Sequence, residues 1–316
     1  MKSSSLSSSL NSNIIYSTKI KEINFLHFST CHQITSKSFS LNKFKNVFNT
    51  ISKLNKTINL FNGDILNNIN QKTDIPLLNN VHASILDVNG FLRNYFQSNE
   101  TNYHPQSNEL KTTAVSLCSN LFENNNTLSN ESFCQKLFGN GIHSTMMFEY
   151  ENIKIGFMAL IDNLVYEKLN KAIKLEMNHK SDNILFGNDD EDELNSSVTS
   201  QIEYVDYVQE ADRLSKQLRL CGANVIVCLI NMESENNEQR LLKEASDLDI
   251  VFGGYFNNIN SASSKTTVDL KKTFFNNRYL IKTESNFDCI SLVTIRLDEF
   301  NSNKMVDIAI NKYIVD

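Results

Sequence analysis

The sequence predicts an α/β protein with short parallel strands at the centre of its sheet, and three observations carry this prediction. Residues 225–232 form a nearly continuous apolar run, and residues 250–252 form a second one directly before Gly253 and Gly254. Helical patterns flank both runs, which is typical of strands that are covered on both faces. The third observation is a strand–helix–strand order over residues 23–61, which makes a right-handed crossover between parallel strands.

The N-terminal crossover has a strand, a helix and a second strand in order. Residues 23–28 predict the first strand, which ends in the polar turn 29–32. Residues 57–61 predict the second strand, which breaks at Asn62-Gly63-Asp64. Between them, Ser40 caps a helix. This helix is predicted from apolar residues spaced three and four apart: Leu41, Phe44, Val47, Phe48, Ile51 and Leu54.

The middle of the chain predicts further elements. Residues 75–97 begin as a helix with Leu77, Leu78, Val81 and Ile85 as its apolar positions, and the stretch 87–90 interrupts it. A short strand follows at 114–118. An antiparallel hairpin is expected at 145–150 and 154–160.

The C-terminal third predicts one more amphipathic helix and three closing strands. The helix runs from about residue 206 to 220 and stops at Gly222. Its apolar face consists of Val208, Ala211, Leu214 and Leu218. The strands are expected at 278–282, 291–297 and 305–315.

Composition excludes several classes of function. The chain has 316 residues and a net charge of −6, and without a basic stripe it lacks the electrostatic footprint of a nucleic-acid-binding protein. No run of about 18 apolar residues occurs, so no membrane insertion is expected. The six cysteines show no CxxC spacing, which disfavours a zinc site. A disulfide framework is improbable in a chain of this size, so a reducing compartment is expected. We therefore predict a cytoplasmic protein.

The predicted domain organisation is simple. Residues 1–20 form a Ser-rich tail that is expected to be disordered, and residues 21–316 form one domain. An acidic insertion at about 178–200 contains the run 188–193, in which like charges repel one another and favour a solvated loop. A cation site there is the alternative, but the insertion lacks the glycine and the ligand spacing of a calcium loop.

Polar residues follow several of the predicted strands, and their order along the chain resembles the calcineurin-like metallophosphoesterases, with the 5′-nucleotidase type as the closest likeness. The resemblance covers about residues 23–300. It rests on stretches that occur in the family's order: 26–32 for the opening strand and its Asp-x-His motif, Asn62-Gly63-Asp64 for the Gly-Asp motif, 88–90 for the Asn-His motif, 116–121 and 152–157 for two intervening stretches, 225–232 for the strand before a ligand histidine, and 250–257 for the Gly-Gly-His-x-His turn.

The resemblance implies a four-layer α/β/β/α sandwich of two mixed sheets. It also implies a site for two divalent cations, which polarise a phosphate ester and generate hydroxide. Of the implied metal ligands, His32 and Asp64 are kept, and Asn89 is a third candidate. Either Val88-Asn89 or Asn89-Gly90 occupies the Asn-His motif, and neither registration supplies a histidine.

Four other motif positions are degenerate. Thr30 stands where the family has an aspartate, Asn231 and Asn257 stand where it has histidines, and Tyr255 replaces another histidine. Because an amide oxygen binds a dication weakly and a phenol must first lose its proton, these donors suit a pair of cations poorly. We therefore predict a catalytically inactive, phosphoesterase-like binding or interaction module with no confident catalytic residue and no cofactor.

The alternative is a weak or altered phosphoesterase that holds one divalent metal (Mn, Zn, Fe or Mg) at His32, Asp64 and Asn89. Simpler roles for these residues stay open, since His32 could be a hydrogen-bonded loop residue and Asp64 a turn residue. The expected partner is an unidentified protein or a small anion.

Overall fold

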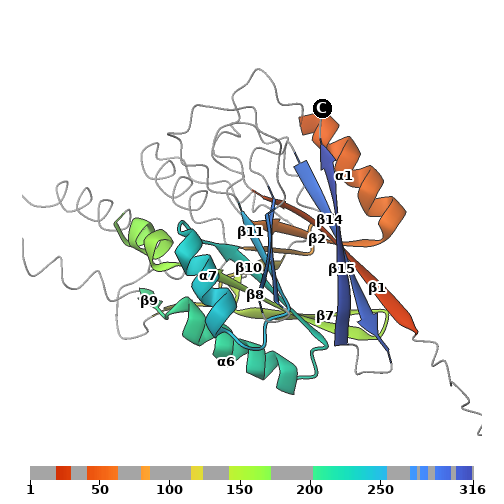
Figure 1. Cartoon of the computed structure of the whole chain (residues 1–316). Coiled ribbons are helices and arrows are strands. Elements are labelled where there is room, and N and C mark those ends of the chain that lie inside the picture. Colours follow the sequence, from red (N-terminus) through yellow and green to blue (C-terminus); the bar gives the residue numbers. More distant parts are fainter. Residues whose placement is uncertain are drawn as a thin grey trace, which may run out of the picture.

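Two mixed β-sheets pack face to face and carry helices on their outer faces (Figure 1). The computed structural model describes residues 19–29, 41–62, 80–85, 115–123, 142–171, 202–254, 271–275, 278–283, 289–299 and 304–314. The predicted tail and the acidic insertion at 178–200 lie outside these ranges, except that the first strand already begins at Ile20. Within the described residues, no helix has the length and apolar character needed to cross a membrane.

The first sheet contains the N-terminal crossover. Its strands, in order across the sheet, are β15 (Lys304–Ile314), β14 (Cys289–Asp298), β1 (Ile20–Ser29), β2 (Thr57–Asn62), β3 (Ala83–Ile85), β4 (Val115–Leu117) and β6 (Ile142–His143). Strands β1, β2, β3, β4 and β6 run parallel to their neighbours in this series, and β14 and β15 are added antiparallel. The sheet is therefore mixed, as predicted.

The second sheet contains the two apolar runs at its centre. Its strands, in order, are β12 (Lys271–Phe275), β13 (Arg278–Thr283), β11 (Ile250–Gly254), β10 (Val225–Asn231), β8 (Ile153–Ile161) and β7 (Thr145–Tyr150). Strands β8, β10, β11 and β13 are parallel, and β7 and β12 form antiparallel edges. A separate antiparallel pair consists of β5 (Leu121–Glu123) and β9 (Ile202–Tyr204).

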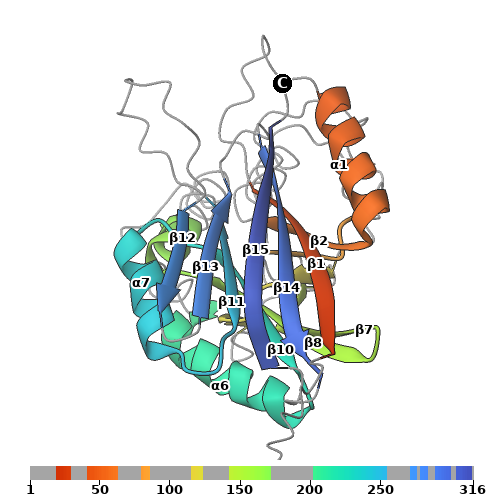
Figure 2. The same ribbon diagram turned by 45° about the vertical axis from the view of Figure 1, so that its right-hand side comes forward.

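Helices cover the two sheets from opposite sides. Helix α1 (Leu41–Asn55) lies against the first sheet, whereas α6 (Tyr207–Leu220) and α7 (Glu235–Glu244) lie against the second (Figure 2). A further helix occupies 163–171. Phe28 on the outer face of β1 contacts Phe44 and Phe48 of α1, with ring centroids 5.4 Å apart in both pairs. Phe44, Phe48 and Ile51 of the predicted apolar face are thus buried, whereas Leu54 at the end of the helix is 77% exposed, so its assignment to that face is wrong.

The main core lies between the sheets. Phe25 of β1 packs against Phe157 of β8 and Phe252 of β11, at centroid distances of 6.5 and 5.7 Å. All three side chains are fully buried. Aromatic pairs of this kind add about 0.5–1.5 kcal/mol each beyond the burial of their area, so this layer holds the two sheets together.

Helix α6 has the ends that its sequence predicts. The Asp206 carboxylate accepts hydrogen bonds from the backbone N–H groups of Val208 and Gln209, at 3.0 and 3.2 Å. Gly222 follows the helix with a φ of +94°, a conformation that glycine adopts without a steric penalty. The predicted stop at Gly222 is confirmed.

One predicted element is wrong, and several were missed. The described part of the predicted helix at 75–97 holds strand β3 instead. Ala83, Ser84 and Ile85 are buried and pair with β4, and Ala83 and Ser84 also pair with β2. The spacing of the four apolar residues Leu77, Leu78, Val81 and Ile85 matched the pattern of an apolar helix face by chance. Sequence reasoning also missed β6, β12, the β5–β9 pair and the helix at 163–171.

Candidate functional site

The carboxyl ends of the parallel strands from both sheets meet at one edge of the sandwich. Hydrogen bonds between strand ends place them together, as Ser29 at the end of β1 bonds Thr283 at the end of β13. Ligand sites of open α/β sheets lie at this edge. The residues that end these strands are Ser29, Asn62, Ile85, Leu117 and His143 in the first sheet and Ile161, Asn231, Gly254 and Thr283 in the second.

Asn231 is the one predicted site residue that the structure describes. It ends the central strand β10, beside Ile161 of β8 in the register, and its side chain is buried. The preceding residue, Ile230, pairs with Gly253 of β11. The position that resembles a family histidine therefore lies at the expected strand end and carries an amide. Gly253 and Gly254 beside it belong to strand β11 and pair with β13, so the predicted turn at these two glycines is wrong.

The other predicted positions lie outside the described residues, although several directly follow described strands. Thr30 comes after the last residue of β1, Asp64 comes two residues after β2, and Tyr255 comes after β11. The remaining predicted positions outside the described ranges are His32, Asn89 and Asn257. Their contacts stay predictions.

Asn62 joins the two sheets at this edge. Its Nδ2 donates hydrogen bonds to the backbone carbonyls of Ile230 and Phe252, at 2.8 and 2.7 Å, so one amide on β2 is fixed to two strands of the second sheet. The side chain is buried. Asn62 directly precedes Gly63 and Asp64, so this contact fixes the last described residue before the predicted Gly-Asp motif.

His27 and Thr283 make a second polar contact between the sheets. The Thr283 hydroxyl and His27 Nδ1 share a hydrogen bond, and the Ser29 hydroxyl donates to the Thr283 carbonyl at 3.0 Å. His27 Nε2 and Asn62 Oδ1 are both buried and have no hydrogen-bond partner. Burial lowers the pKa of His27 to about 3, and the nearby Asn62 side chain opposes this to a smaller extent. The imidazole is therefore neutral at pH 7.

Ser119 and Asn120 tie the end of β4 to β8. The Ser119 hydroxyl accepts the N–H of Ala159 at 2.9 Å, and the Asn120 side chain both accepts from the N–H of Ile161 at 3.1 Å and donates to its carbonyl at 2.8 Å. These residues belong to the stretch 116–121 that carries part of the family resemblance. Their role in this structure is to hold the two sheets in register.

Asp162 is a buried carboxylate that sequence reasoning did not single out. Its Oδ1 accepts the N–H of Val165 at 3.0 Å and caps the helix at 163–171. Its Oδ2 accepts the backbone N–H of Glu233 and the Asn237 amide, both at 2.9 Å. Since three donors already occupy the carboxylate, it positions the loop after β10. Its place directly after a buried strand is the sequence signal that could have found it.

Cys118 and Cys228 are both buried, in agreement with the prediction that they pack as small hydrophobic residues. Burial raises the pKa of the Cys118 thiol to about 12, and it raises that of Cys228 further. Neither thiol forms the reactive thiolate at neutral pH.

Among the described residues, Asn231 alone stands at a position for which the family resemblance implies a metal ligand. In the part of the chain that the structure covers, no three His, Cys, Asp or Glu side chains come together as a metal site would require. At the described motif position, Asn231 offers an amide oxygen. Two closely spaced dications require carboxylates and imidazoles, and this position supplies neither.

Replacing Asn62 by alanine is expected to lower the free energy of unfolding by about 1–3 kcal/mol, because two buried carbonyls lose a donor. Denaturant unfolding followed by circular dichroism measures the change. Asn46→Ala, on the exposed face of α1, is the matched control and is expected to change stability by less than about 0.5 kcal/mol. Equal stability of the two variants would contradict the joining role of Asn62.

Comparisons with known proteins add to this geometry. A scan against models of protein families and a search of curated proteins found no match to the sequence. Solved structures do match. The calcineurin-like phosphoesterase YfkN from Bacillus subtilis aligns with 94% of this chain and 92% of its own, with a TM-score of 0.59 and 13% identity.

Two nucleotidases align with this chain in the same way. The NAD nucleotidase of Haemophilus influenzae aligns with 94% of this chain at a TM-score of 0.60 and 12% identity, and 56% of its own chain is covered. A 5′-nucleotidase precursor from Thermus thermophilus aligns with 93%, at a TM-score of 0.56 and 10% identity, and 54% of its own chain is covered. This chain thus spans about half the length of both. The two packed sheets and their flanking helices are therefore the fold of the calcineurin-like phosphoesterases and 5′-nucleotidases.

Proposed function

We propose that this protein is a phosphoesterase-like binding or interaction module that does not hydrolyse phosphate esters. The observation that carries the proposal is Asn231: it ends the central strand β10 at the edge where such folds place their ligands, and it carries an amide in place of an imidazole. Thr30, Tyr255 and Asn257 are the other three positions at which the sequence differs from the metal ligands that the family resemblance implies.

The expected losses in metal affinity favour a protein that does not catalyse hydrolysis. Disturbing a residue that merely orients a metal ligand typically costs about 10–100-fold in metal affinity or activity. Here four positions that resemble direct ligands have changed, including one that should be a carboxylate. Without paired cations, the fold lacks the Lewis acid and the metal-bound hydroxide that this chemistry uses.

The strand-end edge remains suited to binding. Hydrogen bonds of Asn62 and Ser29 join the two sheets there, and none of these contacts involves a metal ligand. A small anion or a protein segment is the proposed occupant. A cytoplasmic location is also part of this proposal.

A second candidate is a one-metal phosphoesterase that uses His32, Asp64 and Asn89 with Mn, Zn, Fe or Mg. The observation that favours it is the fixed position of Asn62, two residues before Asp64, because a ligand aspartate needs a firmly held backbone nearby. In this case Asp64 would bind the metal directly.

Metal analysis combined with a phosphate-ester assay separates the two candidates. After incubation with Mn²⁺ and dialysis, the full chain is expected to retain less than stoichiometric metal and to leave p-nitrophenyl phosphate unhydrolysed above background. The control is Asp64→Ala, which is expected to match the unmodified protein in both measurements. Stoichiometric metal with turnover that Asp64→Ala abolishes would instead establish the one-metal enzyme.

A further inference from the structure

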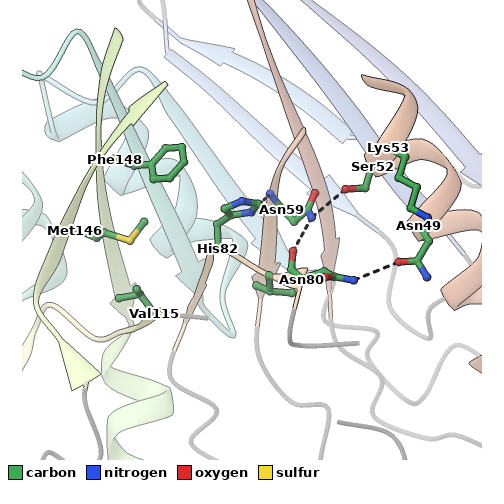
Figure 3. A pocket seen from close by; sticks show the side chains of 10 residues that line it. Asn49, Ser52, Lys53, Asn59, Asn80, His82, Val115, Met146 and Phe148 are labelled. Carbon is green, nitrogen blue, oxygen red and sulfur yellow. Dashed lines mark hydrogen bonds between the residues drawn. The ribbon is translucent and has the colours of Figure 1, made fainter. Parts of the chain in front are cut away.

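A cavity of about 540 Å³ opens at the opposite end of the strands from the candidate site. It lies beside the start of β3 and β4, between α1 and the edge strand β7 (Figure 3). The described residues that line it are Asn49, Ser52, Lys53, Asn59, Asn80, Val81, His82, Val115, Met146 and Phe148. Its volume is in the range of small-molecule sites.

The two walls of the cavity differ in chemistry. Val115, Met146 and Phe148 make an apolar wall on one side, and α1 presents Ser52 and Lys53 on the other (Figure 3). Among the described lining residues, Lys53 is the only charged one. It has no ion pair with any described residue and is exposed. A ligand with an apolar body and a polar end matches this division.

His82 adds a donor between the walls. Its Nδ1 accepts the backbone N–H of Asn59 at 3.0 Å, and the ring meets Phe148 edge-on at a centroid distance of 5.7 Å. Burial lowers the pKa of His82, so the ring is neutral at pH 7 and its single proton is on Nε2. The imidazole can therefore donate one hydrogen bond without carrying charge.

Hydrogen bonds connect several polar residues of the cavity to one another, and some of their N–H groups are left to donate to a ligand. The Asn59 amide donates to the carbonyl of Asn80 at 2.6 Å and to the Ser52 hydroxyl at 3.2 Å. Asn80 donates to Asn49 Oδ1 at 3.3 Å, which leaves the amide nitrogen of Asn49 as a further donor. Donors and one positive charge, with no carboxylate among the described lining residues, favour an anionic group.

We infer that this cavity binds a small amphiphilic anion, whose apolar body packs on Met146 and Phe148 and whose anionic group lies at Lys53. The site is separate from the strand-end edge of the proposed function and does not depend on it. The ligand class is an aromatic or short aliphatic carboxylate, sulfonate or phosphate.

A matched pair of probes tests the inference. 8-Anilinonaphthalene-1-sulfonate carries an anionic group on an aromatic body, and N-phenyl-1-naphthylamine is its uncharged counterpart. The full chain is expected to bind the sulfonate about tenfold more tightly than the neutral probe, as one charge-assisted hydrogen bond would give. Lys53→Met is expected to remove most of this difference, whereas Lys45→Met, which removes the same charge two turns away on α1, is expected to retain it.

The place of binding is tested separately with ¹³C-methyl methionine labelling. Saturating sulfonate is expected to shift the Met146 methyl signal, which Met146→Leu identifies by its loss. Three results would overturn the inference: equal affinity of the two probes for the unmodified chain, an equal effect of Lys53→Met and Lys45→Met, or an unshifted Met146 signal at saturation. Because neither probe depends on a metal, these results are independent of the phosphoesterase assay.

Discussion

Restoring family-type donors at the four degenerate positions is expected to raise the affinity for Mn²⁺ by at least about 100-fold. The variant combines Thr30→Asp, Asn231→His, Tyr255→His and Asn257→His. Each replacement exchanges a weak donor for a carboxylate or an imidazole, and changes around metal ligands are worth about 10–100-fold each. Isothermal titration calorimetry, with the metal content after dialysis as a second measurement, gives the change.

The same variant with Asp64→Ala is the control, and it is expected to lose most of the gain, because Asp64 stands where the family's carboxylate binds metal. A thermal unfolding scan of each variant checks that the buried position 231 accepts the larger imidazole. If the unmodified chain already holds two Mn²⁺ ions as tightly as the restored variant, the proposed loss of the metal site is wrong.

Lowering the pH from 7 to 5 is expected to reduce the free energy of unfolding by about 2 kcal/mol through His27 alone. Burial lowers the pKa of His27 from 6.5 to about 3 in the folded chain. Between these values the unfolded chain binds a proton that the folded chain does not, so stability falls as the pH falls. The contribution is fully present above the unfolded pKa and is lost progressively down to the folded one.

Denaturant unfolding at pH 7, 6 and 5 measures this slope, and His27→Asn provides the comparison because its amide oxygen can still accept from Thr283. Asp249, whose pKa burial raises, acts in the opposite direction, and Asp212, whose pKa the Lys216 hydrogen bond lowers, acts at lower pH. Both cancel in the difference between the two proteins. Identical slopes would show that His27 is not the group responsible.

Most of the fold could be predicted from the sequence where the pattern was long and repeated. Three patterns were long enough to be distinguished from chance. They are the apolar run at 225–232, the polar and apolar faces of α6, and the spacing of apolar residues in α1. Strand β3 could not be predicted, because three residues carry no periodicity. Its identity as a strand depends on pairing with β2 and β4, which are distant in sequence.

The candidate site, too, could be predicted from the sequence only in part. The sequence shows directly that position 231 carries an amide. The prediction that Thr30, Tyr255 and Asn257 also replace metal ligands came from the family resemblance. The hydrogen bonds that join the two sheets could not be predicted from the sequence. Asn62 bonds carbonyls 168 and 190 residues away, and His27 bonds a hydroxyl 256 residues away.

The sequence by itself thus predicted the α/β class, because that class depends on local periodicity. The four-layer sandwich and the candidate cation-binding positions came from the order of motifs that resembles the phosphoesterases. Only the tertiary structure decided which polar residues hold the two sheets together, why His27 stays neutral and where the cavity beside α1 and β7 opens. Burial and hydrogen bonding between distant strands are properties of the packed chain, since they exist only when the two sheets meet.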